Sequence, residues 1–316
     1  MFPMQKMFLR RAGLALLLML AATALTFWLV TAAPGNVAAL IAERAAGAGA
    51  DGQMIDRIAD ELGLNDPLPV RYLRWLGDAV TGDFGISLRT GKPISGEFAE
   101  RIPVTATLMA GGGILALIIS LGLGLWGAAS NGGPVDRFLH GLALVGASTP
   151  NFFIAALLVI IFAVGLGWVP SFGNYGPSSW ILPSITIALF PGSVLARVVR
   201  VNLQEAMSRP FATTGFAKGM TRRAVLMREA LPNIAIPYIT TFGAQFTLMI
   251  IGAIVVERVF GLSGVGSFFI EAIRFRDFIG MQAVLTLFVV FFVSVNLLVD
   301  LVAMLIDPRM RRARRA

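Results

Sequence analysis

Long stretches without a charged residue limit this chain more than any other feature of its sequence. The longest of them runs from Phe138 to Ala196 and covers 59 consecutive positions. The other charge-free stretches are Ala12–Ile41, Ile102–Val135 and Ala230–Val256, and a last apolar stretch, about Phe278–Ile306, contains a single charged residue, Asp300. A helix of about 20 apolar residues crosses the hydrocarbon layer of a bilayer and satisfies its own backbone polar groups there. The sequence therefore predicts an all-α integral membrane protein, in agreement with a mean hydropathy of +0.78.

The lengths of these stretches predict six transmembrane helices. The longest stretch is too long for one span and fits two, joined by the Gly-, Pro- and Ser-rich linker Gly165–Trp180. The second span is rich in glycine, which predicts close packing against other helices. The first stretch also fits a cleaved signal peptide, because Thr31–Ala33 resemble the small residues before a cleavage site. Pro34 and the length of the apolar core favour a retained first helix.

Basic residues are unequally distributed between the two sides that six spans define. The chain has 26 basic and 18 acidic residues, a net charge of +8. Both termini and the segment between the fourth and fifth spans share one side, which holds 16 basic and four acidic residues, a net charge of +12. The other side has a net charge of −3. Excess basic charge marks the cytoplasmic side, so we expect both termini in the cytoplasm and attribute the basic composition to topology, not to nucleic-acid binding.

The spans divide the chain into four predicted parts. These are residues 1–33 (cytoplasmic N-terminus and first transmembrane helix), 34–102 (extracytoplasmic region), 103–306 (transmembrane core) and 307–316 (basic cytoplasmic tail). Within the extracytoplasmic region, Gln53–Leu62 and Val70–Val80 have apolar residues at helical spacing. We expect both to be short helices that rest on the outer membrane surface or on the spans.

A cationic segment, residues 212–232, separates the fourth span from the fifth. Ala212–Lys218 is compatible with a short helix, and Gly219 can adopt the positive φ that ends it. Thr221 can cap a second helix, which Pro232 is expected to stop. Small and basic side chains around the glycine suit insertion into a groove on another protein. We therefore interpret this segment as a docking element and not as a catalytic site.

Polar residues interrupt the predicted third span. They are Ser148, Thr149, Pro150 and Asn151. A helix break at membrane depth survives only where protein or a water-filled path satisfies the released backbone groups. These four residues are therefore candidate elements of a transport pathway, with a packed helix kink as the alternative.

Several kinds of chemistry are excluded or disfavoured by the residues present. The chain has no Cys and one His, His140, so HExxH metalloprotease chemistry is excluded and a protein cage for a bare metal ion is not expected. The sequence contains no P-loop motif, so the chain is not expected to hydrolyse ATP by itself.

Gly261–Gly264 matches the GxSG motif of rhomboid-type proteases, but the predicted topology separates Ser263 from His140 by a membrane thickness. Asp300 in the last span suits helix packing better than a proton relay.

Separated sequence motifs, in a consistent order, resemble one known family. Ala217, Lys218 and Gly219, followed after eleven residues by Leu231 and Pro232, are similar to the G and LP parts of the EAA loop of ABC importer permeases. Further similar segments are Leu62–Leu88, Glu100–Leu108, Ser148–Phe153, Leu166–Pro170, Val255–Gly266 and Asn296–Arg309. The chain resembles the first permease subunit of the dipeptide, oligopeptide and nickel importer family.

The resemblance implies a fold, partners and site residues. The implied fold is the type I ABC importer permease fold, with six transmembrane helices, cytoplasmic coupling helices and an extracytoplasmic region after the first helix, in the bacterial inner membrane. The implied partners are a second, homologous permease, two ATP-binding subunits that hold ATP and magnesium, and an extracytoplasmic solute-binding protein; this chain itself is expected to bind no cofactor. The implied coupling residues are Ala217, Lys218, Gly219, Thr221, Arg222, Arg223, Leu231 and Pro232. Thr213–Gly215 and Glu229 depart from the family pattern, so their contacts stay open.

The identity of the solute stays open at this point. The resemblance implies ATP-driven import of di- or oligopeptides or similar polar solutes by alternating access, with a nickel chelate or glutathione as the alternative. Outside this class, a self-sufficient channel or a proton-coupled carrier that uses Asp300 and the Pro150 break is a second alternative.

Overall fold

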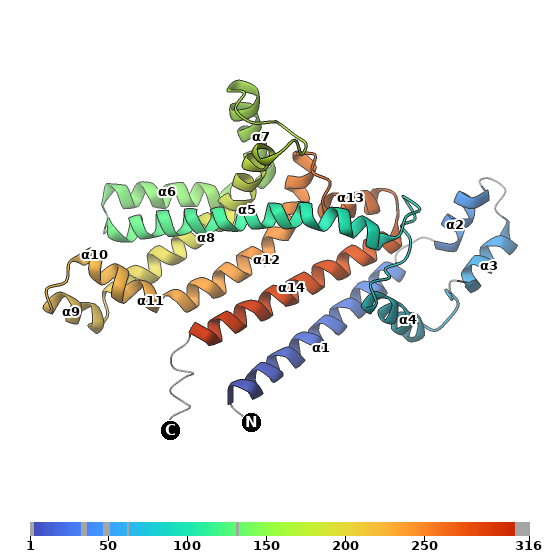
Figure 1. Ribbon diagram of the computed structural model, residues 1–316, viewed down its shortest axis with the longest axis horizontal. Helices are drawn as coiled ribbons and strands as arrows, with labels where there is room; N and C mark the ends of the chain where they lie inside the picture. Colours follow the sequence, from blue (N-terminus) through green and yellow to red (C-terminus); the bar gives the residue numbers. More distant parts are fainter. Residues whose placement is uncertain (1–2, 33–36, 47–50, 62, 131–132, 307–316) are drawn as a thin grey trace.

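Five long apolar helices form the body of the molecule (Figure 1). The computed structural model describes residues 3–32, 37–46, 51–61, 63–130 and 133–306. The basic tail predicted for 307–316 and the residues Ala33 and Pro34 lie outside these ranges. The long helices are α1 (Pro3–Ala32), α5 (Ile94–Ala129), α8 (Ile181–Met207), α12 (Ala235–Val259) and α14 (Phe278–Ile306). Each of the five is long and apolar enough to cross a membrane.

A bent helix pair supplies the sixth candidate span. It consists of α6 (Pro134–Ser148) and α7 (Asn151–Leu158), and α7 continues as a π-helix through Val159–Gly165. The two arms meet at an angle of 107°, so the pair counts as one span only if it is a broken span and not a re-entrant loop. The described ranges contain no β-strand and only the isolated bridge between Ile86 and Pro93. The predicted all-α membrane fold is confirmed.

Short helices lie at the two ends of the long helices. One end carries α9 (Pro210–Ala217), α10 (Arg222–Val225), the π-helical turn Leu226–Ala230 and α11 (Leu231–Asn233). The opposite end carries α2 (Val37–Ala46), α3 (Gly52–Glu61), α4 (Leu68–Val80) and α13 (Val265–Arg274). A 3-10 turn, Pro177–Trp180, leads into α8. Helices α3 and α4 coincide with the two predicted amphipathic segments, whereas α2 was not predicted and α5 begins eight residues before the predicted boundary at residue 102.

Helix α5 packs tightly on α8 because glycines line the contact. A β-carbon added at Gly124 would lie 2.6 Å from Val199 and 2.9 Å from the carbonyl oxygen of Ala196, and one added at Gly112 would collide with Ile187. Small residues let helix backbones approach closely where lipid offers no hydrophobic driving force. The predicted close packing of the glycine-rich second span is therefore confirmed, with α8 as its partner.

A buried carboxylate, Glu257, joins α12, α13 and α5. Its side chain is fully buried. The Thr105 hydroxyl of α5 donates to Oε1 over 2.6 Å, and the Ser267 amide of α13 donates to Oε2 over 2.8 Å. Thr105 also accepts a hydrogen bond from the Val265 amide over 2.9 Å. Gly264 leaves space for the carboxylate, because a β-carbon there would collide with it.

A second buried carboxylate, Asp277, caps α14 and holds the loop between α4 and α5. It accepts hydrogen bonds from the Ser87 hydroxyl at 2.5 Å, the Leu88 amide at 3.0 Å and, within the first turn of α14, the Gly280 amide at 2.9 Å. A carboxylate at this position satisfies amide groups that the helix leaves without partners. The loop at residues 84–93 is thus fixed to the start of the last span.

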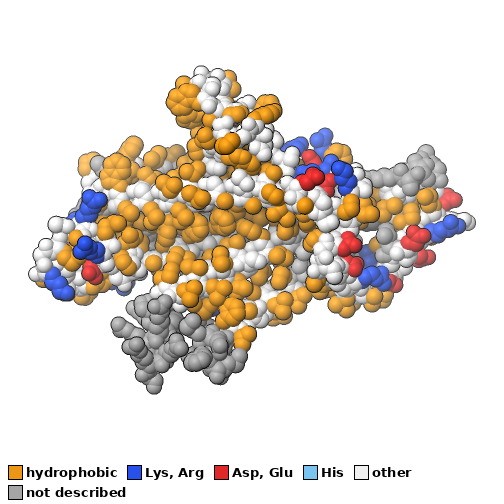
Figure 2. Space-filling model, in the orientation of Figure 1, with side chains coloured by type: hydrophobic (Ala, Val, Ile, Leu, Met, Phe, Trp, Pro, Cys, Tyr) orange, Lys and Arg blue, Asp and Glu red, His pale blue; other side chains and the backbone are white. Residues whose placement is uncertain are grey.

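Helix α14, which is the last predicted span, is paired with α1, the first predicted span. Arg11 of α1 forms an ion pair with Asp300 of α14, which favours the helix-packing interpretation of Asp300 over a proton relay. Asn296, four residues before Asp300 on α14, donates to the Phe292 carbonyl of its own helix at 2.8 Å. Figure 2 shows apolar side chains over the long helices and charged side chains near the two ends, the distribution expected of a protein embedded in lipid.

We predict that Thr105→Val destabilises the protein through Glu257. The substitution removes one donor to a buried carboxylate and leaves the Val265 amide without its acceptor, at a cost of about 1–3 kcal/mol. The apparent melting temperature of the purified chain in detergent is therefore expected to fall. Thr107→Val is the matched control, because Thr107 is exposed on the same helix and bonds the Pro103 carbonyl of that helix. Equal melting temperatures for the two variants would contradict this account of Glu257.

Candidate functional site

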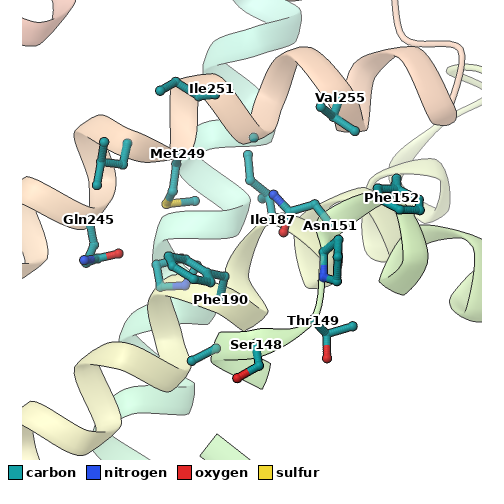
Figure 3. Close-up of a pocket in the computed structure, with 15 residues that line it drawn as sticks. Ser148, Thr149, Asn151, Phe152, Ile187, Phe190, Gln245, Met249, Ile251 and Val255 are labelled. Carbon is teal, nitrogen blue, oxygen red and sulfur yellow. The ribbon is translucent and has the colours of Figure 1, made fainter. Parts of the chain in front are cut away.

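An open pocket lies where the bent pair meets α8 and α12 (Figure 3). Its volume is about 440 Å³. The break between α6 and α7 forms one wall, Ile187, Phe190 and Pro191 of α8 form the second, and one face of α12 forms the third. The structure therefore brings together all four residues of the predicted break, Ser148, Thr149, Pro150 and Asn151, at one concave site.

The chain leaves the helical path at Thr149 and Pro150. Both residues have extended backbone angles, as expected for a proline and the residue before it. The Thr149 hydroxyl donates to the Val145 carbonyl over 2.7 Å, and the Pro150 carbonyl accepts from the amides of the first turn of α7. These bonds satisfy backbone groups that the break would otherwise leave without partners. The two arms on either side of the break are bent by 107° relative to each other.

Two side-chain amides, Asn151 and Gln245, give the pocket its polar character. Asn151 starts α7 and lies against α12 at Gly252, where an added β-carbon would be 2.7 Å from Asn151 Nδ2. The Gln245 Oε1 atom is buried and has no hydrogen-bond partner within the described part of the chain. None of the described side chains that line the pocket is charged. The site therefore offers neutral polar groups within apolar walls.

The segment at residues 212–232 has the predicted helix, glycine turn and second helix. Gly219 has a φ of +79°, and the Thr221 hydroxyl accepts from the Ala224 amide over 3.3 Å as the cap of α10. Four further residues of the predicted coupling set, Ala217, Lys218, Arg222 and Arg223, lie on or beside this turn, and the last two, Leu231 and Pro232, lie in α11. Ala217, Lys218, Gly219, Thr221, Arg222 and Arg223 are exposed, Leu231 is half-buried and Pro232 is exposed.

The second helix ends at Asn233, one residue after Pro232, close to where it was expected to stop. The backbone stays helical from Arg222 to Asn233 and passes into α12 after Ile234. A π-helical turn precedes α11, and Pro232 falls in the first turn of α11, where a missing amide proton costs no hydrogen bond. The Asn233 side chain donates to the Glu229 carbonyl over 2.7 Å and so satisfies a group at this junction.

The same segment is packed onto the ends of α5 and α8. Leu226, Ala230 and Ile234 form one buried cluster with residues of those two helices. The α8 members are Val199, Leu203 and Ala206, and the α5 member is Ala128.

Nearby, the buried Asp136 at the start of α6 forms a bidentate ion pair with Arg200 of α8, at 2.5 and 2.6 Å. Helix α8 continues to Met207, seven residues beyond Arg200, whereas Arg197 and Arg200 were expected to end the fourth span.

Several residues of the site were not found from the sequence. Gln245 and Gly252 line the pocket and lie within the charge-free stretch Ala230–Val256, which predicts a span but no polar site, and Glu257 follows directly after that stretch. An amide side chain inside an apolar span was an available signal for Gln245. The partner of Glu257, Thr105, lies 152 residues away in the sequence, so no local pattern could have indicated it.

Two family models match the chain over most of its length. Residues 120–312 match the model described as binding-protein-dependent transport system inner membrane component, and residues 4–110 match its N-terminal companion. The chain belongs to this family. It is therefore the permease subunit of a binding-protein-dependent ABC importer, a multi-pass membrane protein without a catalytic role, as the resemblance implied.

Relatives with assigned names support this membership. The permease is 38% identical to a probable peptide ABC transporter permease of Sinorhizobium fredii, over 90% of this chain and 92% of the relative. It is 35% identical to a putative peptide transport system permease of Brucella abortus, over 98% and 99%. It is 34% identical to the glutathione transport system permease GsiC of Escherichia coli, over 91% and 92%.

A solved transporter structure has the same fold. The permease aligns with a chain of the inward-facing MetNI methionine ABC transporter at a TM-score of 0.57 and 15% identity. The alignment covers 66% of this chain and 96% of that chain. The predicted type I importer permease fold is confirmed.

We predict that Gly252→Val disables transport without preventing membrane insertion. The added side chain would collide with Asn151, and overpacking of this kind costs about 1–3 kcal/mol, which displaces the start of α7. Solute uptake by cells should fall while the amount of permease in the membrane stays normal on immunoblots.

Gly122→Val is the matched control for this substitution. Gly122 also lies within a span, but no atom lies within 4 Å of a β-carbon added there. Normal uptake by Gly252→Val would show that the close approach of Asn151 to α12 is not required.

Proposed function

We propose that this permease forms half of a translocation path for di- and oligopeptides or similar polar solutes. A second, homologous permease supplies the other half, two ATP-binding subunits drive the cycle, and a solute-binding protein delivers the solute. The observation that carries the proposal is the placement of the whole α6–α7 break, with Gln245 and Gly252 of α12, around one open pocket.

The chemistry of the pocket supports a peptide-like solute. Neutral amide and hydroxyl groups hydrogen-bond to peptide groups whatever the side chains are, and a lining without charge does not trap one charged end of the solute. The relatives are named for peptide and glutathione transport, and glutathione is itself a small peptide. The alternative of a nickel chelate gains no support from the described lining, which offers no carboxylate or imidazole.

The α7 arm supports a second permease as partner. Its apolar side chains Phe152, Phe153, Ile160 and Val164 are exposed, and the arm projects from the body of the molecule (Figure 1). The pocket at its base is open rather than enclosed by this chain. A homologous subunit packed on this arm would close the pocket and complete the path.

The α9–α11 segment supports docking of a cytoplasmic ATPase. Its turn exposes small and basic side chains, Ala217, Lys218, Gly219 and Arg223, at the end of the bundle where α1 begins and α14 ends. The excess of basic residues assigned to that side argues that it faces the cytoplasm. ATP and magnesium belong to the partner subunits in this scheme, because the sequence of the permease contains no P-loop.

The packing of this segment suggests how ATPase motion reaches the pocket. The segment runs directly into α12, and Leu226 and Ala230 pack on Leu203 and neighbouring residues of α8. Helices α8 and α12 form two of the three pocket walls. A shift of the segment would therefore move both walls together and open the path alternately to the two sides of the membrane.

A self-sufficient proton-coupled carrier is the less favoured alternative. It would use Asp300 together with the Pro150 break. Asp300 is paired with Arg11 on the α1 side of α14, and no described residue of α14 lines the pocket. ATP-independent uptake driven by a proton gradient, in liposomes that contain this chain alone, would favour the carrier.

We predict that Gly219→Asp abolishes solute uptake and solute-stimulated ATP hydrolysis while the complex still assembles in the membrane. The substitution places a charged side chain at the exposed turn and forces it into a positive φ. Uptake by cells and ATPase activity of the purified complex are the measurements.

Gly82→Asp is the matched control for the docking turn. Gly82 is exposed, has a φ of +88° and has open space around an added β-carbon, but it lies in the loop after α4 at the opposite end of the molecule. Uptake should be kept in this variant. Loss of uptake in both variants, or in neither, would reject the docking role of Gly219.

A further inference from the structure

Helix α4 is attached to the first span by aromatic and polar contacts. The Tyr72 hydroxyl donates to the Leu20 carbonyl over 3.1 Å and lies 3.0 Å from the Thr23 hydroxyl, which is buried. The rings of Tyr72 and Trp75 pack on Phe27 with centroids 5.6 and 5.8 Å apart. These contacts fix α4 at the level of residues 20–27 of α1.

The ion pair between Arg11 and Asp300 allows the depth of residues 20–27 of α1 within the bilayer to be estimated. Charges are costly within hydrocarbon, so this pair marks one boundary of the layer. Phe27 lies 16 residues further along α1, about 24 Å at 1.5 Å per residue. The hydrocarbon layer is about 30 Å thick, which places Phe27 about 6 Å inside the opposite boundary.

The surface of α1 at this level is itself suited to lipid. The side chains of Leu25, Trp28 and Leu29 are exposed there, and all three are apolar. The paired hydroxyls of Tyr72 and Thr23 also fit this depth, because polar groups within hydrocarbon need partners inside the protein. Helix α4 therefore lies beside a part of α1 that contacts acyl chains.

Part of the apolar face of α4 is uncovered at this depth. Leu73 and Val80 are seven residues apart, so they share one side of the helix, and they are 65% and 80% exposed. Arg74 and Asp78 lie on a different side, where Arg74 pairs with Asp66 at 2.7 Å. A helix with one apolar and one charged side at this depth has the pattern of an interfacial amphipathic helix.

We propose that α4 inserts the face that carries Leu73 and Val80 among the acyl chains of the leaflet at the α13 end. Its charged side then faces the headgroups. The proposal is a lipid-binding surface on the permease, continuous with the lipid-facing surface of α1. It does not depend on the identity of the transported solute.

Spin labels on single cysteines test this proposal, because the chain has no native Cys. The full-length permease is labelled at Leu73→Cys or Val80→Cys and reconstituted in lipid nanodiscs. Collision with oxygen, which concentrates in hydrocarbon, is compared with collision with a water-soluble nickel chelate. Asp78→Cys is the control on the charged side of α4, and Leu17→Cys, exposed on α1, is the lipid-facing reference.

The proposal predicts that the labels at Leu73 and Val80 collide with oxygen and lose collision with the chelate, as the label at Leu17 does, whereas the label at Asp78 collides with the chelate. Chelate collision at Leu73 equal to that at Asp78 would show a water-exposed surface and overturn the proposal. Loss of collision with both reagents at Leu73 would show a protein-covered surface, such as one that receives the binding protein or another subunit, and would also overturn it.

Discussion

Hydrocarbon offers no hydrogen bonds to a polypeptide backbone, and the central feature of this structure depends on that constraint. The chain interrupts a membrane helix at Thr149 and Pro150, where it turns by 107°. The interruption is stable because the Thr149 hydroxyl and the Pro150 carbonyl serve the neighbouring backbone groups. As a result, polar side chains that would be unfavourable toward lipid are gathered at one pocket, opposite Gln245 on α12. The break and the pocket are therefore two aspects of one arrangement.

Helix α12 connects the pocket to both ends of the molecule. At one end, the α9–α11 segment continues into α12 and packs on α8 and α5 through Leu226, Ala230 and Ile234. At the other end, the buried Glu257 of α12 holds α13 and α5 together. A helix held at both ends transmits a displacement instead of absorbing it. Under the proposed function, this arrangement would couple a distant ATPase to the solute path, and it would need no chemistry from the permease itself.

Features set by local sequence were predictable, and features set by contacts between distant residues were not. Charge-free stretches indicated the spans, and the residues Ser148–Asn151 indicated the break, because Pro150 and its neighbours act on their own backbone. The turn at Gly219 was predictable for the same reason. The end of the second helix beside Pro232 was predictable too, whereas the π-helical turn before it was not. The buried roles of Glu257 and Asp277 could not be predicted, because their partners Thr105 and Ser87 lie 152 and 190 residues away in the sequence.

The central claim is that the solute passes through the pocket at the α6–α7 break. Chemical modification of Asn151→Cys tests it most directly, in the assembled transporter with cysteine-free partners, using a membrane-impermeant thiol reagent. The account predicts modification from the α9–α11 side in one nucleotide state and from the α13 side in the other, with protection by transported solute. Failure of the reagent to reach residue 151 from either side, or access from both sides in a single state, would contradict the account.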